Sequence, residues 1–454
     1  MEYDEVIQHI GDFGKYQKRL LAVIFFPVMF NSFSAPISNF LLGDHSHRCR
    51  ILELQNDTYA VQNTVHSVLI NVTIPTLEDG SYDPCHIMTN GSRRTCDDWV
   101  FDDSVFSNTI ISQFSLVCEK KLSNSHAVAT YFIGQMASPF LLIPIGDIIG
   151  RRLLACITLT LVFAVNIAMP FSNSLALFAV FRFLDGLLAA SLYTTSFVIG
   201  IELLGALKRK IAATVILLIY CLGEFVLVVL AYFIRDWRWL QVTVALPMAL
   251  PLIYWWPKVL PESVRWLMSR GRMEEALVIL RRAAKTNKKS LPSNVNVKYD
   301  TTKISNIKIL KELFTSRKLL LYWSIAASNW FVIAFIYNGI KMNIGKLGGD
   351  LYVSFTLVVV AETLGYSLLF TMDIVGHKRL HMIVMAEGKM KKALPLILYG
   401  VIVFVVTLLT IILPETSGRK LPDYVKESEI VDCHKGQRKA VKSDDEDNEI
   451  ESDL

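Results

Sequence analysis

The chain has 454 residues, of which 52% are hydrophobic and only 19% are charged, against about 25% charged residues in ordinary soluble domains. Its mean hydropathy of +0.40 and its long uncharged runs place it among integral membrane proteins. It lacks the Gly-rich phosphate loop of ATP-driven pumps, and its nine histidines are scattered rather than grouped with cysteines at zinc spacing. We therefore expect no enzyme activity, no cofactor, no bound metal and no nucleic-acid partner.

The first long apolar run covers 20–42, after a mixed-charge segment at 1–19. It is long enough to cross a bilayer as a helix, so we expect an uncleaved anchor rather than a cleaved signal peptide. Helix is the expected form because lipid cannot satisfy unpaired backbone groups. Eight more runs of 18 residues or longer follow: 127–145, 153–170, 175–200, 211–234, 239–256, 319–340, 351–374 and 393–413.

The distribution of lysine and arginine predicts the orientation in the membrane. The segment 258–318 has 15 Lys/Arg against 5 Asp/Glu, whereas 43–124 has 6 Lys/Arg against 11 Asp/Glu. Cytosolic loops carry the excess of positive charge in multi-pass proteins. We therefore expect 1–19 and the central loop 258–318 in the cytosol, and 43–124 outside the cell at the plasma membrane.

The outer segment has the composition of an extracellular domain. All three Asn-x-Ser/Thr sequons of the chain lie there, and they predict glycosylation at Asn56, Asn71 and Asn90. Four of the seven cysteines lie there too: Cys49, Cys85, Cys96 and Cys118. An even number of cysteines in an oxidising compartment predicts two disulfides, in any of three pairings.

Two internal repeats indicate a protein built from two related halves. The motif Asp-Ile-Ile-Gly-Arg-Arg at 147–152 recurs as Asp-Ile-Val-Gly-His-Lys-Arg at 373–379. A Leu-Pro-Glu-Ser/Thr element at 260–267 recurs at 413–421. Repeats of this kind, set among apolar runs, are typical of membrane transporters.

The repeats are unequally spaced, which predicts a shortened second half. The interval from Asp147 to Pro261 is 114 positions, but that from Asp373 to Pro414 is only 41. The difference has room for about three helices at roughly 20 residues per span, and we place the deletion between 381 and 392.

The expected architecture is therefore an all-α membrane protein of about nine transmembrane helices. A complete six-helix bundle covers 20–257, and a truncated bundle covers 319–413. The tail, 414–454, is acidic. An odd number of spans places this tail outside the cell, whereas its repeat relationship places it in the cytosol, and the sequence leaves both open.

Several motifs together resemble the organic cation and carnitine transporters (solute carrier family 22) of the major facilitator superfamily. They are Asp-x-x-Gly-Arg-Arg after the second span, Arg182-x-x-x-Gly186 in the fourth, and the large cysteine-bearing outer loop. The resemblance also rests on Glu202 with Arg209, on the segment 232–238, on Pro-Glu-Ser-Val-Arg at 261–265 and on the opening segment 3–14. The resemblance covers about 1–385 and 393–425, and it implies two helical bundles that expose a central substrate site to each side in turn.

The chain departs from the family pattern in four places. Ile143 stands where the signature loop usually begins with Gly, and Val264 replaces the second Pro of Pro-Glu-Ser-Pro-Arg. The outer loop has four cysteines where many relatives have six. The region that matches family spans nine, ten and most of eleven is absent, and in cation-transporting relatives that region supplies a carboxylate and several cavity-lining groups.

An organic cation held at mid-membrane needs a desolvated negative charge and aromatic faces. Glu362 in the eighth span aligns with a family carboxylate, and Glu224 in the fifth is a second intramembrane acid. The aromatic candidates for the substrate site are Tyr220, Trp330 and Tyr337. Each of these residues could instead have a structural role, in a hydrogen bond between helices or in packing.

Two further sets of charged residues are candidates for conformational roles. Arg182 and Asp185 lie three positions apart on one helix face and can pair, either for coupling or to stabilise helix contacts. The family resemblance implies a cytosolic charge network that latches one conformation: Asp147, Gly150, Arg151, Arg152, Glu202 and Arg209, with Asp373 and Lys378 in the second half.

Partners and alternatives complete the hypothesis. We expect a small organic cation or zwitterion as substrate and the lipid bilayer as environment. Residues 274–288 form a basic amphipathic stretch that could lie along the anionic inner leaflet or be a plain cytosolic helix. The last three residues, 452–454, could enter a PDZ groove if the tail is cytosolic. Two other readings stay open, namely a shortened form that does not transport, and a cell-surface receptor or adhesion protein.

Overall fold

The computed structural model describes residues 3–43, 45–51, 53–54, 56–78, 80–89, 91–256, 258–291, 314–342, 344 and 350–371. The chain divides into two compact units. The first consists of Met1–Thr301 and Met342–Tyr366, and the second of Thr302–Lys341 and Ser367–Leu454. Nearly all of helix α16 (Leu351–Ser367) thus belongs to the first unit, although it follows α15 (Arg317–Met342) in the chain.

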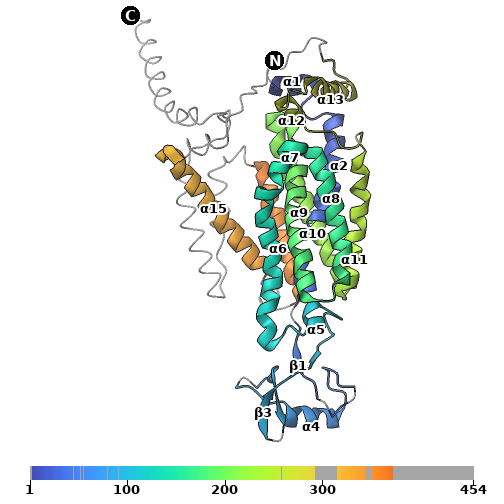
Figure 1. Ribbon diagram of the computed structural model, residues 1–454, viewed down its shortest axis with the longest axis vertical. Helices are drawn as coiled ribbons and strands as arrows, with labels where there is room; N and C mark the ends of the chain where they lie inside the picture. Colours follow the sequence, from blue (N-terminus) through green and yellow to red (C-terminus); the bar gives the residue numbers. More distant parts are fainter. Residues whose placement is uncertain are drawn as a thin grey trace, which may run out of the picture. The chain divides into compact units, whose positions relative to one another are not determined.

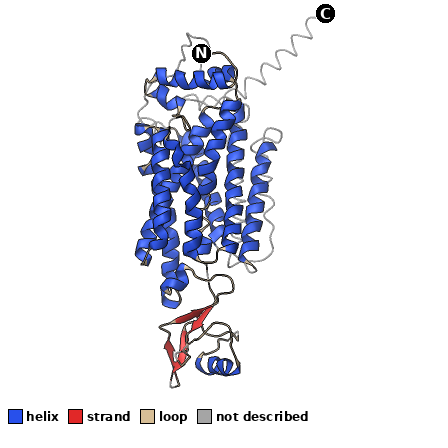
Figure 2. Cartoon of the chain, turned by 90° about the vertical axis from the view of Figure 1, so that its right-hand side faces the viewer, coloured by secondary structure: helices blue, strands red, loops and turns tan. Residues whose placement is uncertain are grey.

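Within the described residues, six helical stretches are long and apolar enough to cross a membrane, and they coincide with six of the predicted spans. Four lie in the bundle of the first unit: α6 (Lys121–Leu141) with α7 (Ile143–Ile149), α8 (Arg151–Ala168) with η2 (Met169–Phe171), α9 (Leu175–Glu202) and α10 (Ala206–Phe233) (Figures 1 and 2). The other two are α15, and α16 with η5 (Leu368–Thr371). Large apolar side chains cover the outside of the first-unit bundle, with Phe140 80% and Phe233 76% exposed. Such a surface is suited to lipid rather than to water.

The first and sixth predicted spans are not single unbroken helices, which corrects the expectation for both. In the first, α2 (Lys15–Asn31) ends, and turns lead to the short helix α3 (Ser38–Leu41). In the sixth, α11 (Trp237–Ala245) continues as a 3₁₀ helix, η3 (Leu246–Trp255). Pro247 and Pro251 favour this change because proline has no N–H for the α-helical hydrogen-bond ladder. Hydropathy alone does not reveal such breaks.

Helices α6 and α9 cross at two glycines. A Cβ on Gly186 would lie 2.0 Å from the carbonyl oxygen of Tyr131, and one on Gly134 would lie 2.1 Å from that of Phe183. The two backbones therefore touch, as is common where small residues meet between membrane helices. This contact fixes the position of α9 along α6, and with it the position of the charged side chains of α9 within the bundle.

Three short helices cover one end of the bundle: α1 (Tyr3–Ile10), α12 (Val264–Ser269) and α13 (Met273–Thr286) (Figure 1). The apolar face of α1 is fully buried. The hydroxyl of Tyr3 donates a hydrogen bond of 2.9 Å to the carbonyl of Glu202 at the end of α9. This end is the one that the charge distribution predicts to be cytosolic.

The outer segment lies at the opposite end of the same unit (Figure 2). It contains α4 (Thr64–Thr73), α5 (Ile110–Phe114) and η1 (Cys118–Lys120). Its four short strands are a departure from the all-α expectation: β1 (His47–Cys49) pairs antiparallel with β4 (Trp99–Phe101), and β2 (His86–Thr89) with β3 (Ser92–Thr95). They are confined to this loop and leave the helical character of the membrane part unchanged.

Side-chain hydrogen bonds attach the outer segment to the bundle. Asn108 donates a 3.2 Å hydrogen bond to Asp236, whose other carboxylate oxygen caps the first turn of α11. The Trp237 indole donates a 2.9 Å hydrogen bond to Gln113 on α5. Trp237 is fully buried, so this joint is part of the core.

Several predictions fall outside the described residues and are not tested by the structure. They concern Asn90, Asp373, Lys378, the ninth span at 393–413, and the tail 414–454 with its PDZ-type end.

Candidate functional site

Arg182 and Asp185 on α9 are both fully inaccessible to solvent inside the bundle. The guanidinium and the carboxylate lie 3.2 Å apart. Arg182 also donates to the carbonyl of Ser34 at 3.0 Å and to the hydroxyl of Ser38. Ser34 lies in the break between α2 and α3, and Ser38 is the first residue of α3, so the interruption of the first span places two oxygen acceptors against a buried cation.

Two amides that sequence reasoning missed complete this network. Asn166 on α8 donates a 2.8 Å hydrogen bond to Asp185, and Gln241 on α11 donates one of 2.6 Å to the side-chain oxygen of Asn166. The ring of Tyr131 on α6 lies 4.6 Å from the Arg182 guanidinium. The only signal in the sequence is that both amides stand in apolar runs, where polar residues are rare and often functional.

The two candidate acids both lie near Tyr220 in the first unit. Glu224 on α10 is fully buried, and Glu362 on α16 is half-buried. Tyr220, one turn before Glu224, lies close enough to both acids to interact with their charges, and Tyr366, one turn after Glu362, does the same. Each helix thus presents one acid and one tyrosine four positions apart, which places them on one face.

Further aromatic rings pack next to Tyr220. Tyr193 on α9 packs edge-on against Tyr220, with ring centroids 5.9 Å apart, and stacks on Phe197 at 6.2 Å. Both tyrosines are partly buried. Two carboxylates next to several aromatic faces form the combination that attracts organic cations.

The remaining aromatic candidates, Trp330 and Tyr337, lie on α15 in the second unit. Trp330 is 74% exposed. The Tyr337 ring lies 4.4 Å from the ammonium group of Lys341, which also donates a 2.5 Å hydrogen bond to its hydroxyl. The structure thus brings Glu224, Glu362 and Tyr220 together and leaves the α15 residues as separate candidates.

The predicted latch network centres on Arg151 at the start of α8. Its guanidinium forms an ion pair with Glu202 and lies 4.0 Å from Asp147 and 3.4 Å from the hydroxyl of Ser263. Ser263 in turn donates to Glu202. Arg209, predicted near Glu202, donates a 3.0 Å hydrogen bond to the carbonyl of Leu204.

Glu262 of the Pro-Glu-Ser element belongs to the same network. Sequence reasoning missed this role. The Glu262 carboxylate accepts 2.9 Å hydrogen bonds from the backbone N–H groups of Arg152 and Ser263. It therefore caps the positive end of the α8 dipole. Gly150 is required here, because its φ is +109° and a Cβ would lie 2.5 Å from Glu262.

The network joins four parts of one end of the first unit: the α7–α8 junction, the end of α9, the start of α12 and the end of η3. Arg152 donates to the carbonyl of Trp255 at 2.6 Å, and the indole of Trp266 donates to that of Asp147 at 2.9 Å. All of these groups belong to the first unit.

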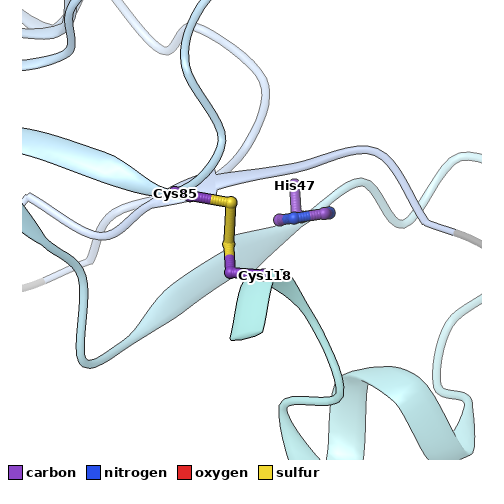
Figure 3. Close-up of side chains that lie close together, drawn as sticks. All are labelled: His47, Cys85 and Cys118. Atoms are coloured by element: carbon purple, nitrogen blue, oxygen red, sulfur yellow. A yellow bond between two sulfur atoms is a disulfide. The ribbon is translucent and has the colours of Figure 1, made fainter. Parts of the chain in front are cut away.

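In the outer domain the structure links Cys49 with Cys96 and Cys85 with Cys118. His47 lies beside the second disulfide, so that three residues of metal-ligating type, one histidine and two cysteines, meet (Figure 3). A disulfide sulfur is not the thiolate that binds metal ions. This cluster is therefore a cross-link with a neighbouring imidazole. Of the sequon asparagines, Asn56 and Asn71 are exposed.

A buried triad of Arg48, Asp57 and His66 organises the loop around the first sequon. Arg48 pairs with Asp57, and His66 Nε2 lies 3.0 Å from the same carboxylate. Burial of Asp57 acts to raise its pKa, but hydrogen bonds from Arg48, the Ile51 N–H and His66, with the charge of Arg48, lower it more, so its pKa lies below the ordinary value. Asp57 therefore stays ionised and holds the turn that presents Asn56.

Comparison with known proteins adds the family. Residues 70–388 match the family described as "Sugar (and other) transporter". The chain is 30% identical over 409 residues to the organic cation transporter protein of Drosophila melanogaster, covering 83% of this chain and 72% of that one. It is 30% identical over 394 residues to human organic cation/carnitine transporter 2, covering 81% and 70%. Mouse solute carrier family 22 member 3 is 31% identical over 408 residues, with 83% and 72% covered.

Solved structures support the fold. The proton:xylose symporter XylE with a bound glucose derivative aligns with a TM-score of 0.51 at 16% identity, over 87% of this chain and 82% of that one. The inward-open form of XylE from E. coli aligns with a TM-score of 0.50 at 14% identity, over 89% and 81%. The predicted fold class is thus confirmed, although the shortening of the second half is not settled by it. The chain belongs to the sugar (and other) transporter family of the major facilitator superfamily, as a multi-pass membrane transporter related to the organic cation and carnitine transporters.

Proposed function

We propose that this transporter carries organic cations or carnitine-like zwitterions across the plasma membrane by alternating access. The observation that carries the proposal is the convergence of Glu224 and Glu362 on Tyr220 inside the first unit. A cation would leave water to reach these acids, and a low dielectric strengthens their attraction for it. The relatives named as organic cation and carnitine transporters support the same substrate class.

The proposed residues have different roles in the transporter. Glu362 and Glu224 supply negative charge, and Tyr220 with its neighbour Tyr193 supplies aromatic faces for an alkylammonium group. Arg182 and Asp185 neutralise one another and so are proposed to position α9 rather than to bind the substrate.

Uptake of a radiolabelled organic cation such as tetraethylammonium should be saturable in cells that express this chain. Glu362→Gln and Glu224→Gln should each raise the apparent KM at least about tenfold, because a charged hydrogen-bonding partner contributes roughly 1.5–3 kcal/mol. The measurement is initial uptake against substrate concentration, with surface protein quantified by biotinylation and by sensitivity to a glycosidase.

The matched control is Glu275→Gln, which removes an exposed acid of α13 that is paired with Arg272. It should leave the apparent KM unchanged. Wild-type kinetics in both Glu362→Gln and Glu224→Gln, with normal surface amounts, would contradict the assignment of the site.

A second candidate function is a shortened form that does not transport. The unequal repeat spacing, 114 against 41 positions, favours it, since the missing region would supply part of the cavity in the relatives. The same assay separates the two candidates. A wild-type chain that reaches the cell surface in glycosylated form but takes up no substrate would replace the first candidate by the second.

We also propose that the ion pair between Arg151 and Glu202 latches one conformation at the cytosolic end. Its side chains are 26% and 11% exposed, so the pair is sheltered enough to bias a two-state equilibrium. Arg151→Gln and Glu202→Gln should each slow uptake, and the double variant should be no slower than the worse single one. In such a cycle coupled residues differ from additivity by about 0.5–3 kcal/mol. Losses that simply multiply would show that the pair does not act as a unit.

A further inference from the structure

The cytosolic end of the first unit carries a basic cleft that the transport site does not explain. The cleft has a volume of about 220 Å³ and lies between the first turns of α2 and the helix α13. Three cations line it: Arg19 from α2, Lys258 from the segment after η3, and Arg282 from α13. Among the residues that the structure describes, no carboxylate lines the cleft.

The packing of α13 shows which side of this helix is covered by protein. Its apolar face, which includes Leu280 and Ala283, is buried against the protein, so it is not available to enter lipid. The basic stretch therefore does not lie on the membrane by its apolar side, as one of the two sequence hypotheses proposes. Its cations Arg282 and Lys285 are exposed.

The walls of the cleft are held in place. Asn287, just after α13, accepts a 2.9 Å hydrogen bond from the N–H of Tyr16 and donates bonds of 2.9 Å to the carbonyl of Ile10 and to Gln17. Arg282 donates a 3.2 Å hydrogen bond to the carbonyl of Lys258, which keeps its guanidinium at the cleft. The three cations thus face one space without forming an ion pair with any described residue.

The depth of the cleft is that of lipid headgroups. Trp255 and Trp256 are 47% and 64% exposed and directly precede the Lys258 segment. Exposed tryptophans of this kind mark the membrane–water interface. Leu20 and Val23, which follow Arg19 at the start of the predicted first span, form part of the cleft lining. The lining therefore combines cations with apolar side chains.

We propose that this cleft binds the phosphorylated headgroup of an anionic phospholipid of the inner leaflet, of the phosphoinositide class. Three converging cations match a headgroup with several phosphate charges better than one with a single charge. A volume of 220 Å³ equals about seven waters at roughly 30 Å³ each, enough for a phosphate group and the start of the group that it esterifies. Basic pockets at the cytosolic ends of membrane helices are suited to such headgroups.

The test is titration of the purified full chain in detergent with dioctanoyl phosphatidylinositol 4,5-bisphosphate, followed by native mass spectrometry. Saturable binding of one lipid is expected. Arg19→Gln, Lys258→Gln and Arg282→Gln should each weaken it about fivefold, the effect of one cation near an anionic lipid. Lys285→Gln is the matched control, because it removes the same charge from α13 outside the cleft, and it should change the affinity less than twofold.

Two further ligands decide the source of the phosphate. Dioctanoyl phosphatidylserine should bind more weakly, and free inositol trisphosphate should bind more weakly than the lipid because it lacks contacts with Leu20 and Val23. Equal losses in Lys285→Gln, or no saturable binding, would overturn the site. Inositol trisphosphate binding as tightly as the lipid would overturn the membrane source. Because binding is measured without transport, the result is independent of the proposed substrate.

Discussion

Asp185→Asn should destabilise the protein by about 3–5 kcal/mol, because it leaves the buried Arg182 guanidinium without its counter-charge. Both side chains are fully buried, and the oxygen of the introduced amide could still accept the hydrogen bond from Asn166. The loss therefore reports the missing charge rather than a missing contact. The measurement is the thermal unfolding midpoint of the purified chain, together with the fraction that reaches the cell surface.

Removal of both charges is the control for this prediction. The double variant Arg182→Met with Asp185→Leu keeps the side-chain volume but buries no charge, and such replacements are often neutral or stabilising. We expect it to recover most of the stability. If it folds but fails to take up substrate, the pair has a role in the transport cycle. If Asp185→Asn is as stable as the wild type, the ion pair is not the element that holds α9 in place.

Gly186→Ala should be the most disruptive small substitution in the bundle. The new Cβ would lie 2.0 Å from the carbonyl oxygen of Tyr131, and a backbone atom within a helix cannot move aside as a side chain can. Helices α6 and α9 would have to separate, which should cost about 1–3 kcal/mol or more. It would also shift Arg182 relative to its partners on the α2–α3 turn. Thermal unfolding and uptake should both fall.

The matched control lies on the same helix. A Cβ on Gly200 would lie 3.4 Å from the end of the Ile24 side chain, which is flexible. Gly200→Ala should therefore be neutral, or more stable by up to about 1 kcal/mol from the helix propensity of alanine. Equal stability of the two variants would show that the α6–α9 crossing is looser than this contact implies.

The sequence predicted the helical membrane fold because lipid demands long apolar helices, and that demand can be read directly from hydropathy. The breaks in the first and sixth spans escaped it, since the residues around Pro36 and Pro251 carry no charge and so do not interrupt an uncharged run. The short strands of the outer loop escaped it as well. They are held by cross-links and a few backbone bonds rather than by an alternating apolar pattern.

From the sequence, a contact in the candidate site could be predicted only where both partners lie on one helix. The spacing of Arg182 and Asp185 places them on one face, but nothing in the chain says that Asn166 and Gln241 from other helices will complete the network. The same limit applies to α13, whose periodicity predicts an apolar face but not what covers it. The pairing of the four outer cysteines is a further case, because their order along the chain allows three patterns.

The joint between α5 and α11 has a practical consequence. Asn108 and Gln113 bind Asp236 and Trp237, so the cross-linked domain outside the membrane is fastened to the amino-terminal bundle rather than hinged on it. An antibody fragment raised against that domain would follow any rotation of the bundle. Such a fragment would serve as a rigid fiducial mark for electron microscopy of a small membrane protein. It would also report the rocking of the bundle without blocking the substrate path.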